Sequence, residues 1–176
     1  MNTADIDRLM SDIPDYVGTF SCASLPPPPS GDTRQRLMIV NTDTSNEPGE
    51  HWVAIYIDSA GRRGEYFDSF ARQPPVIFET YMNYNCWDYC SYNQQQLQSI
   101  ASRVCRYYCI FYCMLRSAGI DMFTINILEC DQSNVLLAHL FDSPWGVSYR
   151  WSMVTRRLSG TVIQIFSLED NADLDL

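Results

Sequence analysis

Residues 105–115 (Cys-Arg-Tyr-Tyr-Cys-Ile-Phe-Tyr-Cys-Met-Leu) are apolar on nearly every side over about three helical turns. A helix that is apolar on all faces is a buried one, so this stretch predicts a central buried helix. Cys105 would lie at its N-terminus, where unpaired backbone N–H groups and the positive end of the helix dipole favour a thiolate over a thiol. Such a setting can lower a cysteine pKa from ~8.5 to roughly 3.5–7.5. Cys105 is therefore a candidate nucleophile, if the chain also supplies a base.

Length and composition favour one globular domain. The chain has 176 residues, of which 46% are hydrophobic, enough to build a real core. We expect a single domain over residues 1–176, with an acidic tail at 169–176 that frays. The longest apolar runs are far shorter than the ~18 residues that a membrane span needs, so no membrane partner is expected. Residues 1–7 lack the basic start and apolar core of a secretory signal.

The charge of the chain bears on its partners. The net charge is −9, and all twelve basic residues are arginine, which leaves no lysine side chain for ubiquitin attachment. An acidic chain is a poor candidate for nucleic-acid binding, which depends on neutralising phosphates. The seven cysteines are odd in number. Without a secretion signal, they predict free thiols in an intracellular, reducing compartment.

Periodicity and turn residues predict the other elements. These are a helix at 4–13 capped by Thr3, strands at 37–42, 52–57 and 65–70 with a turn at 58–64, a helix beginning at Pro74, a short edge strand within 85–97, helices at 122–130 and 131–141, and a strand-like segment at 161–166. The predicted fold class is α+β: a mixed central sheet of about five strands beside helices, with the central helix packed on the sheet.

Only two histidines are present, so the candidates for a base are few. His139 lies in an apolar helical segment and is interpreted as a structural histidine. His51 opens a predicted strand, where a base can be both held and exposed. Asp68 lies on the strand expected to run antiparallel to it, ~4.8 Å away, and is a candidate to orient the imidazole. The less favoured alternative is that Asp68 is a strand-end carboxylate that caps the following turn. Asp58 and Asp88 lie in turn-like surroundings and are weaker candidates.

Acyl transfer also needs hydrogen-bond donors directed at the oxyanion. The side-chain amide of Gln98 and the backbone N–H of Cys105 are candidates. Gln98 is one of four nearby glutamines, at 94, 95, 96 and 98, so spacing alone does not select it.

The pattern as a whole resembles a known family. His51-Trp52, Asp68 seventeen residues after the histidine, and Gln98 seven residues before Cys105 are similar to the adenoviral endoprotease (adenain), and still more to the related proteases of Polinton/Maverick elements and adintovirus-like genomes. The peptidases of ubiquitin-like proteins, in the same clan, have the same order. The flanking segments that agree are 18–19, 39–42, 66–70 and 105–109.

The resemblance implies a papain-like or adenain-like fold and a role for each residue. Cys105 would be the nucleophile, His51 the base and then the acid, Asp68 the orienting group and Gln98 an oxyanion donor. Trp52 would line a narrow channel that admits only small residues, so cleavage after glycine is expected. The implied substrates are viral capsid or core precursors, and the implied setting is the nucleus or cytoplasm of a host cell and the virion.

Two features depart from the family. The family has glycine directly after the nucleophile, and this chain has Arg106, which either crowds the oxyanion site or reaches solvent to contact an acidic substrate residue. Adenoviral enzymes use viral DNA and a short disulfide-linked peptide as cofactors. The acidity of this chain argues against DNA activation. A peptide activator remains open, with Cys86 or Cys90 able in principle to accept it, and we expect a monomer.

Other interpretations of the cysteines compete with catalysis. Cys105, Cys109 and Cys113 form one helical stripe, and the last two are expected to be core residues. As a metal site this stripe is weak because it lacks the paired C-x₂₋₄-C spacing of structural zinc. Cys86 and Cys90, with His139 or Cys130, are a further and less favoured alternative as a zinc site. Three functional hypotheses follow: a cysteine endopeptidase for virus-type precursors, a peptidase for ubiquitin-like proteins, or a catalytically weakened relative that acts as a binding protein.

Overall fold

The computed structural model of the chain describes residues 2–27, 34–43, 51–86, 89–98 and 104–131. All of them belong to one compact unit, residues 1–137. The predicted strand at 161–166, the tail at 169–176 and all but the first residue of the predicted helix at 131–141 lie outside the described residues. The elements are α1 Thr3–Met10, β1 Tyr16–Ser21, the short 3₁₀ helix η1 Cys22–Ser24, β2 Gln35–Asn41, β3 Trp52–Asp58, β4 Arg63–Phe67, α2 Val76–Asn85, β5 Tyr89–Tyr92, α3 Cys105–Ser117 and α4 Met122–Asp131.

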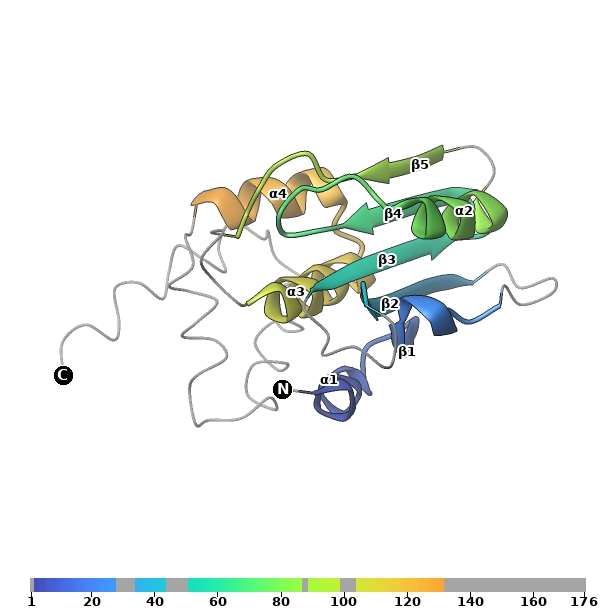
Figure 1. Ribbon diagram of the computed structural model, residues 1–176. Helices are drawn as coiled ribbons and strands as arrows, with labels where there is room; N and C mark the ends of the chain where they lie inside the picture. The colour runs from blue at the N-terminus through green and yellow to red at the C-terminus, as the bar shows by residue number, and fades with distance from the viewer. Residues whose placement is uncertain (1, 28–33, 44–50, 87–88, 99–103, 132–176) are drawn as a thin grey trace, which may run out of the picture. The chain divides into compact units, whose positions relative to one another are not determined.

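The strands form one mixed sheet in the order β1-β2-β3-β4-β5 (Figure 1). The central strand β3 runs antiparallel to both of its neighbours, β2 and β4, whereas the outer strands β1 and β5 run parallel to their neighbours. The predicted α+β class and the mixed sheet of five strands are confirmed. The sheet matters for the site because one of its ends holds both the start of β3 and the end of β4.

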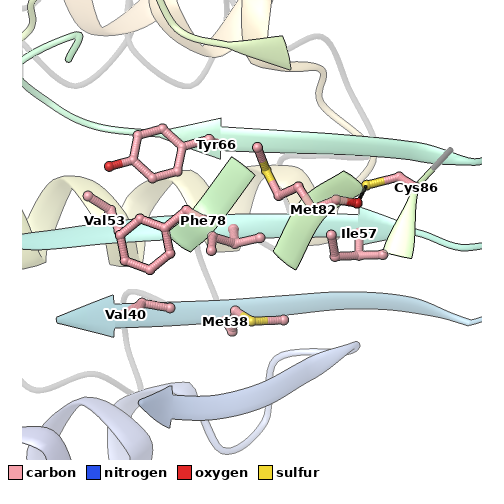
Figure 2. Close-up of a cluster of buried hydrophobic side chains, with 9 residues drawn as sticks. Met38, Val40, Val53, Ile57, Tyr66, Phe78, Met82 and Cys86 are labelled. Atoms are coloured by element: carbon pink, nitrogen blue, oxygen red, sulfur yellow. Dashed lines mark hydrogen bonds between the residues drawn. The ribbon is translucent and has the colours of Figure 1, made fainter. Parts of the chain in front are cut away.

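One face of the sheet packs against α2 (Figure 2). Phe78 and Met82 of this helix are buried against residues of the three central strands. The sheet residues of this cluster are Met38, Val40, Val53, Ile55, Ile57 and Tyr66.

The opposite face packs against α3, which contacts β3 and β2. The rings of Phe67 and Tyr112 stack with centroids 4.5 Å apart, a contact that stabilises by about 0.5–1.5 kcal/mol beyond area burial. Glu65 accepts hydrogen bonds from Tyr112 Oη at 2.6 Å and from Arg116 Nε at 2.9 Å. Because helices cover both faces, β3 is apolar from Trp52 to Ile57 instead of alternating. The prediction that α3 is the buried central helix is confirmed.

Strand β1 was not predicted. It is an edge strand whose residues are mostly half-buried, so it carries neither a continuous apolar run nor a strict alternation. Its pairing with β2 shifts register between Tyr16 and Gly18, and Gly18 has a φ of 135°. A side chain is strained at that φ, which accounts for glycine at this irregularity.

Several predicted boundaries are wrong, since α1 ends at Met10 instead of residue 13 and α2 begins at Val76 instead of Pro74. Helix α1 is capped by Asn2 rather than Thr3, because Asn2 Oδ1 accepts the Asp5 N–H while Asp5 Oδ2 accepts the Asn2 N–H. Strand β4 ends at Phe67 rather than at residue 70, so Asp68 follows the strand instead of lying on it. Within the described residues, no helix is long and apolar enough to cross a membrane.

Candidate active site

Three elements place the candidate residues at one end of the sheet. His51 directly precedes β3, and Asp68 directly follows β4. These strands are antiparallel, with Ala54 paired to Phe67, so the start of one lies beside the end of the other. Cys105 is the first residue of α3, which packs on β3. The sheet therefore brings together residues that are far apart in the sequence.

His51 and Asp68 form a buried hydrogen-bonded pair. The distance from His51 Nε2 to Asp68 Oδ1 is 2.7 Å, and the two residues are 8% and 1% exposed. The ring of Phe70 lies 5.1 Å from the imidazole, centroid to centroid. Burial by itself would lower the pKa of His51. The hydrogen bond and charge of Asp68, together with the nearby sulfur of Cys105, outweigh it and raise the pKa to about 9.

The pKa of Cys105 is shifted in the opposite direction. Burial would raise it, but the nearby imidazole of His51 and the backbone N–H groups of Trp52 and Arg106 outweigh burial and lower it. The second ring nitrogen of His51, Nδ1, is buried and has no hydrogen bond of ordinary geometry to any described residue. Since Asp68 holds Nε2, Nδ1 is the nitrogen left to exchange a proton with the sulfur. The two shifts together favour a thiolate–imidazolium pair.

Asp68 combines the two roles that its position suggested. Its Oδ1 accepts the hydrogen bond from His51 and also one from the backbone N–H of Phe70 at 2.8 Å. Its backbone C=O accepts the N–H of Ala71 at 2.7 Å, which closes the turn after β4. The carboxylate thus caps the turn and holds the imidazole with the same oxygen atom.

Burial distinguishes Gln98 from the neighbouring glutamines. Gln98 is 1% exposed, whereas Gln94, Gln95 and Gln96 are exposed. Its Oε1 accepts a hydrogen bond from Ser69 Oγ at 2.7 Å. Because the oxygen end of the amide faces Ser69, its NH₂ end points in another direction, as an oxyanion donor requires. The residues between Gln98 and α3, 99–103, lie outside the described part of the chain.

Trp52 and Arg106 flank the candidate nucleophile in different ways. Trp52 begins β3 and is 8% exposed. Arg106 is half-buried, and its guanidinium carbon lies 5.3 Å from the centroid of the Tyr107 ring. A cavity of about 370 Å³ lies elsewhere, between α2 and β5, and none of the candidate site residues lines it.

The remaining candidates have other surroundings. Asp58 Oδ1 caps the β3–β4 turn by accepting the Gly61 N–H at 2.9 Å, while Asp88 and His139 lie outside the described residues. Cys109 and Cys113 are fully buried core residues of α3.

The alternative of a zinc site stays a hypothesis. The sulfurs of Cys86 and Cys90 are 3.5 Å apart. Within the described residues, no group of three or more His, Cys, Asp or Glu side chains is placed to hold a metal ion. The other proposed ligands, the side chains of Cys130 and His139, lie outside the described part.

Sequence reasoning did not identify two residues that support the site. Ser69 contacts Gln98, and Asn93 makes two hydrogen bonds to the backbone of Asp68. Asn93 follows β5, in a stretch rich in Asn, Gln and Tyr where no local pattern marks it. The signals available for Ser69 were its position directly after Asp68 and its place in the flanking segment 66–70.

Comparisons with known proteins find a local similarity to a viral cysteine protease. No protein-family model matches it. A stretch of 39 residues is 49% identical to a cysteine protease of African swine fever virus, covering 21% of this chain and 14% of that protein. The chain thus matches only a small part of the length of that relative.

Solved structures of similar proteins resemble this chain only weakly. Two crystal structures of the African swine fever virus protease have TM-scores of 0.44 and 0.39, with 24% and 19% identity. They cover 52% and 69% of this chain and 37% and 42% of theirs. The SUMO protease Ulp1, with its catalytic cysteine oxidised to a sulfinic acid, has a TM-score of 0.46 and 14% identity, covering 80% of this chain and 76% of its own.

Proposed function

We propose that this protein is a cysteine peptidase with Cys105 as its nucleophile. The observation that carries the proposal is the geometry at one end of the sheet, where Asp68 holds the imidazole of His51 and Cys105 begins α3. The pKa of Cys105 is lowered and that of His51 is raised to about 9, while Asp68 holds the imidazole at 2.7 Å. A reactive thiolate with an adjacent proton carrier is what acyl transfer needs. The local identity to a viral cysteine protease supports the same chemistry.

The proposed reaction proceeds in two halves. The Cys105 thiolate attacks the carbonyl carbon of the scissile peptide bond and forms a tetrahedral oxyanion. As this collapses to a thioester, the imidazolium of His51 gives its proton to the leaving amine. Water then attacks the thioester while neutral His51 takes up the water proton. The carboxylic acid product leaves, and the Cys105 thiolate and His51 imidazolium are restored.

The oxyanion would be stabilised at the N-terminus of α3. The backbone N–H of Cys105 lies among the first N–H groups of that helix, which have no carbonyl partner within it. The amide of Gln98, oriented by Ser69, would supply a second donor. Removing one such donor typically costs about 10²–10³ in kcat.

The proposed substrates are virus-type precursor proteins cleaved after a small residue such as glycine. The support is the order His51, Asp68, Gln98, Cys105, with Trp52 beside the histidine, and the local identity to a viral protease. In this proposal Trp52 narrows the approach to the sulfur, and Arg106 contacts an acidic group of the substrate.

The proposal predicts an unusual pH profile for alkylation of Cys105. At pH 6, Cys105 is expected to react with iodoacetamide about 10- to 100-fold faster than free cysteine, because a free thiol is almost wholly protonated there. The rate should stay level as the pH rises and increase again near pH 9, where His51 loses its proton. Peptide hydrolysis should instead decline through pH 9, since the leaving amine then lacks its proton donor. Mass spectrometry of the Cys105 peptide measures the alkylation.

Two comparisons make this test specific. Cys22, a half-buried thiol outside the site, is an internal reference in the same sample. The His51→Ala variant should return Cys105 to the profile of an ordinary thiol. If wild-type Cys105 reacts no faster than free cysteine at pH 6, and His51→Ala changes nothing, the proposed function is wrong.

The substrate class needs a separate test. Peptide libraries that carry glycine, alanine or a bulky residue before the scissile bond should show cleavage only after small residues. A glycine-ending ubiquitin-like aldehyde is the competing probe. Labelling of Cys105 by that probe, with no cleavage of the peptides, would assign the protein to the processing of ubiquitin-like proteins.

A further inference from the structure

The first two residues after β4 contact two different parts of the candidate site. Asp68 accepts a hydrogen bond from His51, and the next residue, Ser69, donates one to Gln98 Oε1 at 2.7 Å. All four residues are at least nine-tenths buried. The placement of this one dipeptide therefore determines both the orientation of the imidazole and the direction of the amide.

Asn93 holds this dipeptide from the neighbouring strand. Its Oδ1 accepts the Asp68 backbone N–H at 2.8 Å, and its Nδ2 donates to the Asp68 backbone C=O at 2.7 Å. The backbone pairing of β4 with β5 ends at Tyr66 and Tyr92. One residue further along, the Asn93 side chain takes the place of the missing strand partner and satisfies both polar groups of Asp68.

The burial of Asn93 shows that these bonds are required. The residue is 1% exposed, and a buried amide without hydrogen bonds costs roughly 1–3 kcal/mol. Nδ2 also donates to the C=O of Gln95 at 3.2 Å, so the Asn93 side chain also holds the segment that leads to Gln98. An amide can supply this combination because it has an acceptor and two donors.

Ser69 holds the second segment through its backbone as well as its hydroxyl. Its C=O accepts the N–H groups of Leu97 and Gln98, at 2.9 and 3.0 Å. The hydroxyl then fixes the rotation of the Gln98 amide. Both ends of the Gln98 residue, backbone and side chain, are thus bound to Ser69.

We propose that Asn93 and Ser69 are positioning residues of this site, Asn93 for the carboxylate that holds His51 and Ser69 for the amide that receives the oxyanion. The inference rests on the proposed function. Neither residue would touch the substrate. Each acts through a neighbour, so each should affect a different part of the catalytic cycle.

Asn93→Ala tests the first half. Without the two hydrogen bonds from Asn93, Asp68 holds the imidazolium less well. The pH of the upper inflection in the Cys105 alkylation profile should therefore move from about 9 toward the ordinary histidine pKa of ~6.5. Alkylation at pH 6 should slow toward the rate of a free thiol, and kcat/KM should fall about 10- to 100-fold. A merely structural role would lower the melting temperature without moving the inflection.

Asn85→Ala is the matched control. Asn85 is another buried amide with two hydrogen bonds, to Arg36 and to the C=O of Tyr81, and it lies on α2. Its removal should lower stability and leave the alkylation profile unchanged. If Asn93→Ala does not fold, Asn93→Ser, which keeps a donor and an acceptor on a shorter side chain, should show a smaller shift in the same direction. Equal profiles for wild type and the folded Asn93 variant would overturn the role of Asn93.

Ser69→Ala tests the second half. It should lower kcat about 10- to 100-fold with little change in KM, and it should leave the alkylation profile unchanged because His51 and Asp68 remain in contact. Ser69→Thr, which keeps the hydroxyl, should recover most of the loss. A change in the alkylation profile, or no recovery by threonine, would contradict the assignment.

The two levels of the proposal fail in different ways. If wild-type Cys105 behaves as an ordinary thiol, the proposed function itself fails. If wild type shows the expected profile and hydrolysis but the variants at positions 69 and 93 match it, only the positioning roles fail.

Discussion

Replacing Cys105 with alanine is expected to abolish peptide hydrolysis, with a loss of about 10⁵-fold or more in kcat/KM, because no other group replaces the thiolate in forming the acyl-enzyme. The fold should be retained, since alanine is a good helix former and the side chain removed is small. The measurement is cleavage of a peptide selected from the library, together with the disappearance of the acylated Cys105 peptide from the mass spectrum.

Cys109→Ala is the matched control for this prediction. Cys109 lies one turn further along α3 and is fully buried. Its replacement should cost about 1 kcal/mol of stability through lost packing and should leave kcat/KM within about threefold of wild type. Residual hydrolysis by Cys105→Ala, at a rate comparable with that of Cys109→Ala, would show that the nucleophile lies elsewhere.

Replacing Asp68 with alanine is expected to lower kcat/KM by about 10²–10⁴-fold. The variant removes both the charge that stabilises the imidazolium and the acceptor for His51 Nε2 and the Phe70 N–H. The upper limb of the pH–rate profile should move down from about pH 9, because without the carboxylate the pKa of His51 falls. Measurements of kcat/KM from pH 5 to about 10 follow this shift, with thermal unfolding recorded in parallel.

Asp68→Asn should be the milder of the two substitutions. Oδ1 of Asp68 accepts both side-chain and backbone hydrogen bonds, and an asparagine keeps an oxygen at that place while losing the charge. The expected result is a profile shifted in the same direction with a smaller loss of rate. Asp58→Asn, at the turn after β3, is the control and should leave the profile where it is. If the upper limb of the pH–rate profile does not shift in Asp68→Ala, Asp68 has no role in the mechanism.

Much of the fold could be read from the sequence because its signals are local. The unbroken apolar character of residues 105–115 predicted the buried helix α3, and the β-branched run at 52–57 predicted β3. Strand β1 lacked such a signal because it is a half-buried edge strand with an irregularity at Gly18. The end of β4 was placed too late because the aromatic run through Phe70 continues past the last strand pair.

The candidate site, like the fold, could be predicted from the sequence only in part. His51, Asp68 and Cys105 were proposed because each residue type has its own chemistry, and the order of the four residues resembles a known family. Spacing alone could not choose among the four glutamines, and only the resemblance selected Gln98. In the structure, burial and the hydrogen bond from Ser69 distinguish it from the other three.

The sequence by itself determined which side chains are able to do acyl-transfer chemistry, and that one of them begins a buried helix. Only the tertiary structure decided how they are held. The bonds from Asn93 to Asp68 and from Ser69 to Gln98 join residues 25 and 29 positions apart. The strand order and the end of the β4–β5 pairing determine these partners, because a buried amide forms hydrogen bonds with the polar groups that the fold places beside it. Local pattern therefore indicates the candidate reacting groups, and long-range pairing in the sheet positions them.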